Sequence, residues 1–511
     1  MLLLFWTASQ AKAQILPKEN SILNYRLIGF SFPAMPQTGE YKIEIATGHY
    51  NTEDSFKENI ILSSEIKTNK QIEEVPSFDI AYTWRVVYKN AQSTIKSELH
   101  HFSTAIIPEV DTNKFRFRII NKAKKYKDAY VFLDGSKALY DMKGFPVWYL
   151  PGIKSGTSPY LFDLKLSPQG TITFINNSEA FEVNYNGDVL WKAPDNGVVS
   201  GDSTEHYNHD FTRLDNGHYM VLGTESKLWH PELPSSKNNS SLPEADKQTG
   251  SDTTNTSQKT AFGTIIEYDQ NGNIVWSWKS SSYFTGADLE YYRKIVNLGK
   301  MGNVKGNNNP GDFHENAFYF DEKEQAIYIS FKAINRVVKI KYPDGYVMNS
   351  YGNVNKQAIP VSVNNFFCGQ HSCRSSEKGY LYLFDNNTCN PGTPPEIVMM
   401  QQPVSDNESL KTIWEYKCTI EQFPDNVPAN YKFPTGGNVL ELPDQSMFAC
   451  MSGFYTKVFI VSLDKEVLWA ALPEKWNPEN NKWESFSQYR ASIITSRQQL
   501  EQLIWNAEEK K

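Results

Sequence analysis

The chain is organised around the stretch 363–387, which contains Gln370-His371-Ser372-Cys373 followed by Ser376-Glu377-Lys378-Gly379-Tyr380-Leu381-Tyr382-Leu383-Phe384. The second run has the pattern of a turn followed by an apolar strand. Two other stretches repeat the order of histidine, turn and strand: His209 before 215–217 and 219–222, and His314 before 321–325 and 327–331. Three histidines at one position of a repeated unit predict a single site at the axis of a closed repeat.

Length and composition limit the classes of protein to consider. At 511 residues the chain is too long for one ordinary compact core, so we expect two domains or an array of repeats. Aromatic residues make up 14% of the chain, which favours β-strands. The formal net charge of -7 argues against a nucleic-acid-binding protein, which usually presents a basic face. No run of 18 apolar residues occurs in the sequence, so no membrane span is predicted.

The N-terminus resembles the end of a secretory signal. Residues 1–14 hold a short apolar run and an Ala-Lys-Ala cleavage pattern, although the basic segment that usually precedes them is missing. A frayed terminus is the alternative interpretation. Export to the periplasm would place the five cysteines in an oxidising compartment and would favour a disulfide bond.

Residues 15–106 are predicted to form a separate small β domain. The segments 41–45 and 82–88 alternate apolar and polar residues, as half-buried strands do. Together with the closing segment 101–105, this pattern resembles a fibronectin type III sandwich, in which about seven short strands pair in two sheets. The expected role is support or docking, because the segment carries no recognisable catalytic group.

Residues 107–472 are predicted to form a six-bladed β-propeller. One half of the repeat is a turn and a strand that ends in tryptophan, or in methionine in one copy, at 142–148, 184–191, 269–276, 343–348, 405–414 and 464–469. The other half is the turn and apolar strand described above, at 167–175, 215–222, 321–331, 377–384 and 443–451, with 130–134 as a degenerate first copy. Six paired halves favour six propeller blades over the alternative, a plain all-β sandwich. Residues 473–511 are expected to be a C-terminal tail with a helix over 497–511.

The histidines lie at the start of the innermost strand of three predicted blades, beside the central channel. Their side chains are expected to converge at one mouth, with Asn316 on the strand after His314 and Lys332 at the end of the next strand. His206 is close enough to His209 to be a weaker candidate. A lone histidine is more often a structural polar residue, but three in register favour a site. Zinc is a further alternative, although Lys332 would repel a cation and no HExxH pair or Cys–His cluster is present.

Four motifs carry a resemblance to a known family. They are Asn208-His209-Asp210-Phe211, Asp312-Phe313-His314-Glu315-Asn316-Ala317, Ile329-Ser330-Phe331-Lys332, and Gln370-His371 with Leu383-Phe384-Asp385-Asn386. In this order they resemble the bacterial arylsulfate sulfotransferase family, over the whole predicted propeller and more loosely over the N-terminal domain. The resemblance implies transfer of a sulfuryl group from a phenolic sulfate ester to another phenol, without a nucleotide donor and without a cofactor.

The resemblance also assigns roles to the candidate residues. The family's sulfated histidine falls on His371, and its supporting residues fall on His209, His314 and Asn316. Its arginine falls on Lys332, which keeps the charge but loses the bidentate guanidinium fork. We therefore expect a ping-pong reaction through a sulfohistidine, since a neutral imidazole is a competent nucleophile and the other groups are donors for charged oxygens. No G-x-x-x-x-G-K-[ST] loop is present to bind a nucleotide phosphate.

Several alternatives stay open. Cys368 and Cys373 flank His371, and a bond between them would stiffen its loop. Members of the family carry a disulfide in this part of the propeller, at a different spacing, and connectivity among the five cysteines does not follow from the sequence. Water in place of the phenol acceptor would make the protein an aryl-sulfate hydrolase, and a non-catalytic propeller that binds a ligand in its channel is a third interpretation. A homodimer is an open assembly state.

Overall fold

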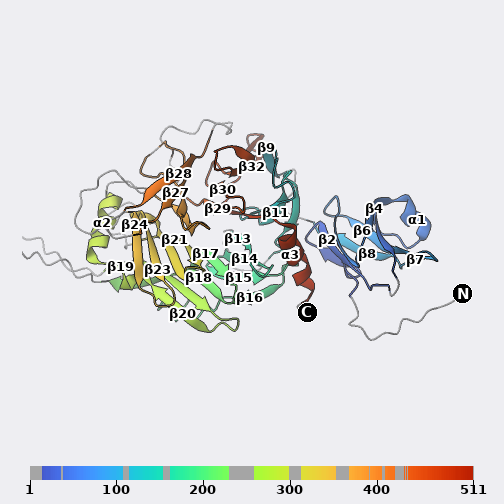
Figure 1. Ribbon diagram of the computed structural model, residues 1–511, viewed down its shortest axis with the longest axis horizontal. Coiled ribbons are helices and arrows are strands. Elements are labelled where there is room, and N and C mark those ends of the chain that lie inside the picture. The colour runs from blue at the N-terminus through green and yellow to red at the C-terminus, as the bar shows by residue number, and fades with distance from the viewer. Residues whose placement is uncertain are drawn as a thin grey trace, which may run out of the picture.

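The structure is a computed structural model (Figure 1) that describes residues 14–35, 38–106, 114–152, 161–229, 258–297, 312–352, 367–390, 392–404, 409–420, 431, 433 and 435–509. These residues form 34 β-strands and three α-helices, so the predicted all-β class is confirmed. The segment predicted as the remnant of a secretory signal, 1–14, lies outside the described residues except for Gln14.

The N-terminal part holds two sheets. The first has the order β1 (Ser21–Leu23), β8 (His100–Thr104), β6 (Ala81–Lys89), β3 (Glu40–Thr47) and β4 (Ile60–Ile66), with β7 (Thr94–Lys96) paired to β6. The second joins β2 (Leu27–Ser31) to β5 (Lys70–Glu74), and α1 (Glu53–Glu58) precedes β4. Phe30 of β2 meets Trp84 of β6 edge to face at 4.9 Å, and both are fully buried. The alternating apolar residues of the two sheets thus share one core.

Six further sheets follow, each with four or more antiparallel strands. The first two are β34 (Ala491–Ile494), β10 (Tyr130–Leu133), β11 (Ala138–Asp141) and β12 (Pro146–Tyr149), and then β13 (Leu161–Leu166), β14 (Ile172–Asn176), β15 (Glu179–Val183) and β16 (Val189–Lys192). The next two are β17 (Tyr207–Arg213), β18 (Tyr219–Trp229), β19 (Gln258–Tyr268) and β20 (Ile274–Lys279), and then β21 (Glu315–Asp321), β22 (Ala326–Phe331), β23 (Arg336–Lys341) and β24 (Val347–Gly352). The last two are β25 (His371–Ser375), β26 (Leu381–Asp385), β27 (Glu396–Gln401) and β28 (Lys411–Lys417), and then β29 (Asn438–Glu441), β30 (Met447–Met451), β31 (Lys457–Val461) and β32 (Val467–Asn477), where β32 also pairs with β33 (Lys482–Ser485) and β9 (Phe115–Asn121).

Each of these sheets joins the two predicted halves of one repeat. The turn-and-strand half corresponds to the second strand of each sheet and the turn before it, and the half that ends in tryptophan corresponds to the fourth strand and the turn before it. The degenerate copy at 130–134 has no first strand directly before it, because β34 from near the C-terminus occupies that place and pairs with β10. The segment predicted as a C-terminal tail therefore supplies a strand to the first sheet.

The repeated tryptophans connect neighbouring sheets. The indole N–H of Trp148 donates to the backbone carbonyl of Tyr185, in the turn before the last strand of the next sheet, at 2.7 Å. Trp276, Trp414 and Trp469 make the same bond, to Pro343, Leu463 and Met142. The bond from Trp469 to Met142 runs from the last sheet to the first. The tryptophan position is thus explained by a buried or half-buried ring whose one donor finds a partner on the adjacent sheet.

The first strands of the sheets also contact one another in order. β34 contacts β13, β13 contacts β17, β17 contacts β21, β21 contacts β25 and β25 contacts β29, while β30 returns to β34. No single described sheet closes on itself. This cycle of contacts gathers the starts of β17, β21 and β25 around a common centre, which is where the candidate histidines lie.

The C-terminal helix links the N-terminal sheets to the rest of the chain. Helix α3 (Arg497–Glu509) packs on β2, where a Cβ at Gly29 would lie only 2.8 Å from Ile504. Glycine at position 29 therefore permits the close approach of helix and strand. Leu500 and Leu503 share one hydrophobic core with Phe30 and with Trp148 of the first four-stranded sheet. Figure 1 shows α3 between the two parts.

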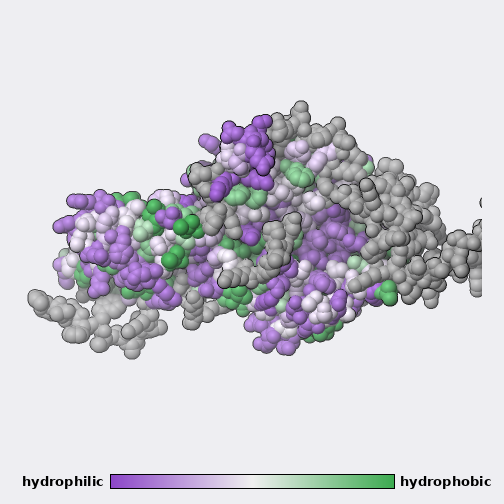
Figure 2. Space-filling model, turned by 180° about the vertical axis from the view of Figure 1, so that it is seen from behind, coloured by the Kyte–Doolittle hydropathy of each residue, from purple (hydrophilic) through white to green (hydrophobic). Residues whose placement is uncertain are grey.

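Two further features complete the fold. Helix α2 (Gly286–Asn297) follows β20, and none of the helices in the described residues is long and apolar enough to cross a membrane. The described part of the surface in Figure 2 is mainly hydrophilic, with hydrophobic residues in small patches.

Cys368 is bonded to Cys389, and Cys373 is a free, buried thiol. The Cys368–Cys373 bond considered from the sequence is therefore not formed, because Asn387 and Thr388 bring Cys389 back beside Cys368, with Cα atoms 5.9 Å apart.

Candidate functional site

The site residues lie at β-bulges near the starts of the first strands. The pairing register shifts between positions 207 and 211 of β17, between 315 and 317 of β21 and between 371 and 374 of β25. His209 and His314 have φ angles of 57° and 54°, and Ser372 next to His371 has 52°. This left-handed conformation is costly for residues other than glycine and is found mainly where function requires it. The bulges turn these side chains away from the regular alternation of the strand.

The imidazole rings gather around one aromatic side chain. The ring centroids of His209 and His314 are 5.4 Å apart. The ring of Tyr489, just before β34, lies 5.7 Å from His209 and 6.2 Å from His371. Phe162 covers Tyr489 at 4.8 Å. The three histidines predicted from the repeat are therefore brought together by strands from three different sheets.

His371 is held in one tautomer. Its Nδ1 lies 2.7 Å from Oδ1 of Asn386, whose amide nitrogen donates to the carbonyls of Phe433 and Gly436 at 2.9 and 3.0 Å. Because these bonds orient the amide, its oxygen faces the ring, and Nδ1 carries the proton. Nε2 accepts a hydrogen bond from the Gly436 N–H at 3.2 Å. Burial, and then the charge of Lys332, keeps the pKa of His371 well below its usual range. The imidazole is therefore neutral, with a lone pair on Nε2.

His209 is anchored through the same ring nitrogen. Its Nδ1 lies 2.7 Å from Oδ1 of Asn208, whose amide nitrogen donates to Thr224 Oγ1 at 2.7 Å. Thr224 in turn donates to the buried carboxyl group of Glu315. Burial raises the pKa of Glu315 to about 8. Burial, followed by the charges of His314 and Arg490, keeps the pKa of His209 well below its usual range. His209 is thus a second neutral imidazole with Nε2 unprotonated.

The remaining predicted residues lie beside the histidines. The backbone N–H of His314 donates to Asp312 Oδ1 at 2.7 Å, and its ring Nδ1 lies 3.4 Å from Oδ2 of the same residue. Lys332 begins the short helix η2 (Lys332–Ile334), and its backbone N–H donates to the His314 carbonyl at 3.0 Å. Burial, opposed by the charge of Asp312, lowers the pKa of Lys332 to about 8. His206 lies outside this group, half exposed, 3.8 Å from Asp202.

The alternation of a regular strand does not predict where the Asn316 side chain lies, because the pairing register of β21 shifts between Glu315 and Ala317. Its amide nitrogen donates to the carbonyl of Gln370 at 2.8 Å, directly before His371. Its Oδ1 is buried without a hydrogen-bond partner among the described residues. Asn316 thus fixes the backbone that carries His371 and keeps one acceptor available.

Two residues that the sequence did not indicate complete the site. Tyr489 has a hydroxyl group that is buried and unpaired within the described part of the chain. Arg490 pairs with Asp163 at 3.0 Å and with Asp210 at 3.1 Å, and it donates to the Asn316 carbonyl at 2.9 Å. Both reach the site only because β34 joins the first sheet. The side chains Asn208 and Asn386, by contrast, stand inside the quoted motifs and could have been assigned as histidine anchors.

The described residues contain no group of three or more His, Cys, Asp or Glu side chains arranged to hold a metal ion. The solved structures that match this chain are distant. A protein of unknown function from Bacteroides caccae is 13% identical, covering 72% of this chain and 98% of its own, with a TM-score of 0.39. A putative 6-phosphogluconolactonase from Bacteroides fragilis is 11% identical, covering 90% and 100%, with a TM-score of 0.29. Similarities this weak support no argument about the fold or the site.

The comparison with protein families is more specific. No curated protein matches the chain. Residues 229–423 match the model of the arylsulfotransferase (ASST) family. The matched range contains His314, Asn316, Lys332 and His371, whereas His209 precedes it. The resemblance predicted from the sequence is therefore confirmed over residues 229–423, the range that matches the arylsulfotransferase family model.

Proposed function

We propose that the chain is an aryl-sulfate sulfotransferase that moves a sulfuryl group from a phenolic sulfate to a phenol through a sulfohistidine at His371. The observation that carries the proposal is the fixed tautomer of this buried, neutral imidazole beside two other histidines and a lysine. A nucleophile needs a free electron pair, and the Asn386 anchor leaves that pair on Nε2. The family match supports the same reaction class.

In the first half-reaction, the Nε2 electron pair of His371 forms a bond to sulfur while the bond between sulfur and the aryl oxygen breaks. The aryl oxygen leaves with the bonding pair as a phenolate and then takes up a proton. The ring keeps its Nδ1 proton, held by Asn386, and becomes a cationic imidazole that carries an anionic sulfo group. The Gly436 N–H donates a hydrogen bond to Nε2 at rest. Once Nε2 is bonded to sulfur, this N–H donates its hydrogen bond to a sulfuryl oxygen instead.

In the second half-reaction, the oxygen of the acceptor phenol attacks sulfur, and the bond between nitrogen and sulfur breaks. The electron pair returns to Nε2 of His371. The neutral Nε2 of His209 is suited to take the phenol proton, because its Nδ1 is already committed to Asn208. Lys332 and His314 are placed beside the same rings to stabilise the sulfuryl oxygens, as cation and as hydrogen-bond donor.

We further propose that the six sheets are the blades of a β-propeller built from 107–472 and closed by β34, with an N-terminal β-sandwich over 15–106. The cycle of contacts between first strands and the bond from Trp469 to Met142 support this closure. Export to the periplasm is supported by the Cys368–Cys389 bond, since disulfides persist in oxidising compartments. Alkylation of free thiols in protein taken from native cells tests this: modification of Cys368 or Cys389 without prior reduction would contradict it.

Mass spectrometry after brief exposure to 4-nitrophenyl sulfate tests the sulfohistidine. The intact protein should gain one sulfo group, located on the peptide that contains His371, and His371→Asn should lose both labelling and transfer. His49→Asn, which replaces an exposed histidine in the loop after β3, is the matched control and should keep both. Parallel lines in double-reciprocal plots of donor and acceptor are expected from the two half-reactions. Full-rate transfer by His371→Asn would refute the covalent mechanism.

The same assay separates the transferase from a hydrolase acting on the same site. Addition of a phenol should increase the release of 4-nitrophenol and yield the sulfated acceptor. If release is unchanged and inorganic sulfate is the product, water is the acceptor and the protein is an aryl-sulfate hydrolase.

A further inference from the structure

A cavity lies at the other end of the strands that carry the histidines. Its volume is about 790 Å³. His209, Glu315 and His371 stand near the starts of β17, β21 and β25, whereas the cavity is lined by the ends of these strands, including Arg213 and Asp321. The cavity is therefore distinct from the candidate active site, although the same strands line both.

A buried group of charges separates the two. Asp210 and Lys165 line the cavity and lie 3.2 Å apart, and Arg490 pairs with Asp210 at 3.1 Å on the side of the histidines. Arg490 also donates to the Asn316 carbonyl. These buried ion pairs therefore lie between the cavity and the residues of the candidate active site.

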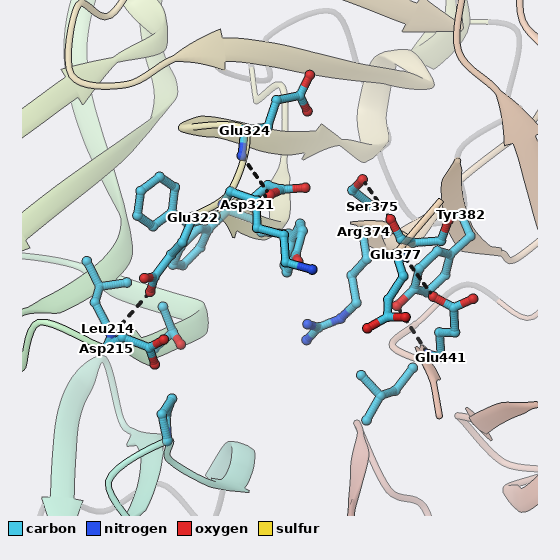
Figure 3. Close-up of a pocket in the computed structure, with 18 of the residues that line it drawn as sticks. Leu214, Asp215, Asp321, Glu322, Glu324, Arg374, Ser375, Glu377, Tyr382 and Glu441 are labelled. Atoms are coloured by element: carbon cyan, nitrogen blue, oxygen red, sulfur yellow. Dashed lines mark hydrogen bonds between the residues drawn. The ribbon is translucent and has the colours of Figure 1, made fainter. Parts of the chain in front are cut away.

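Arg374 is the unusual residue of the cavity. Each other arginine whose side chain the structure describes has a carboxylate partner within ion-pair distance; these are Arg26, Arg85, Arg116, Arg118, Arg213, Arg336, Arg490 and Arg497. The Arg374 side chain makes no ion pair or hydrogen bond to any described residue, and its guanidinium lies 5.4 Å from the ring of Tyr319. Figure 3 shows its side chain extending into the open space between two walls. A partly buried guanidinium with five unused donors is suited to bind an anion from solution.

The surroundings of Arg374 restrict what that anion can be. The cavity also contains the carboxylates of Asp215, Asp321, Glu322, Glu377 and Glu441. The hydrogen bonds that these carboxylates accept from described residues come from backbone N–H groups, which leave the negative charge in place, as for Glu441 with the Glu377 N–H at 3.1 Å. A simple anion would be repelled by this rim, whereas a molecule with an anionic end and a cationic end would be attracted at both. Tyr319, Phe320 and Tyr382 supply apolar surface between the two kinds of charge.

We propose that this cavity binds a short peptide whose C-terminal carboxylate pairs with Arg374 and whose basic side chain is held by the acidic rim. Guanidinium and carboxylate form two parallel hydrogen bonds, which gives the orientation of the ligand. The volume fits a ligand of a few residues, since pockets for small molecules span about 300 to 1,000 Å³. The site does not depend on the sulfotransferase reaction proposed above.

Calorimetric titration of the full chain with the tripeptide Gly-Gly-Lys tests the proposal. Its C-terminal amide, which lacks the carboxylate, should bind at least about tenfold more weakly, and Arg374→Gln should weaken the free acid by a similar factor. In Arg374→Gln the acid and the amide should bind alike, because the two changes remove the same contact. Arg374→Lys should recover part of the loss, and the thermal unfolding midpoint of each variant shows whether it is folded.

Three results would overturn the proposal. The acid and the amide binding equally well to the unchanged protein would exclude recognition of the carboxylate. Replacement of lysine by norleucine without loss of affinity would exclude the acidic rim. The third result would be the absence of binding: no heat on titration of Gly-Gly-Lys to millimolar concentration and no protection of residues 374–377 from hydrogen exchange. Arg374 would then only balance the charge of the cavity.

Discussion

Replacement of Lys332 tests how the site stabilises the sulfuryl oxygens. The resemblance to the family implies arginine at this position, and burial lowers the pKa of Lys332 to about 8. The lysine is therefore mostly cationic at pH 7 and about one-tenth cationic at pH 9. If the charge acts on the sulfuryl group, the first half-reaction should slow by about tenfold per pH unit above pH 8.

Two variants separate charge from other effects. Lys332→Arg stays cationic throughout this range, so its rate should not decline between pH 8 and pH 10. Lys332→Met should be slower at pH 7 by on the order of 10- to 1000-fold, the usual cost of losing one donor to a developing anion. Its rate should also lack the decline above pH 8, because the titrating group is absent.

The assay is a single-turnover measurement of 4-nitrophenol release without an acceptor, from pH 6 to pH 10. Omission of the acceptor keeps the ionisation of a phenol out of the profile, and sulfation of His371 is followed in parallel by mass. A flat profile in the unchanged protein, or the same decline in Lys332→Arg, would show that Lys332 does not supply the charge. Near-normal turnover of Lys332→Met at pH 7 would lead to the same conclusion.

Three further predictions follow from the same contacts. A lysine whose folded pKa is below its usual 10.5 destabilises the folded state, and this destabilisation is complete below about pH 8 and disappears as pH rises toward 10.5. Lys332→Met should therefore raise the free energy of unfolding at pH 7 by up to about 3 kcal/mol in urea titrations, with no gain at pH 10.5. Asn386→Leu removes the anchor of His371 Nδ1 and should slow sulfation about 10- to 100-fold, with ¹⁵N NMR showing a mixture of imidazole tautomers instead of one. Replacement of both Cys368 and Cys389 by serine should lower the free energy of unfolding by about 3 kcal/mol, the chain-entropy value for a loop of this length, and an unchanged urea midpoint would contradict it.

The sequence was informative where a feature repeats locally. Each repeat carries its own turn and its own alternation, so the two halves of the sheets, and with them the positions of His209, His314 and His371, could be predicted from the repeat. The tryptophan position was visible as well. Its reason was not, because the partner of Trp148 is a carbonyl in the next sheet.

Features that depend on the pairing of segments far apart in the sequence could not be predicted. β34 has four residues and pairs with β10 more than 350 positions earlier, and no local pattern marks such a strand. Tyr489 and Arg490 enter the site only through this pairing. The disulfide was ambiguous for a related reason: Cys373 is nearer to Cys368 in sequence, but β25 carries it into the core, whereas the chain after β26 returns Cys389 to Cys368.

The two anchored histidines differ in a way that separates their roles. Asparagine oxygens hold Nδ1 of both His209 and His371, so both present an unprotonated Nε2. His371 is 1% exposed and its Nε2 already accepts a hydrogen bond from the Gly436 N–H, which favours attack on a sulfuryl group that takes over this donor. His209 is more exposed and lies against the rings of His314 and Tyr489, where a phenol oxygen can approach from solvent. In the proposed mechanism, the same tautomer would therefore serve bond formation to sulfur at His371 and acceptance of a proton at His209, because burial and the Gly436 donor differ between them.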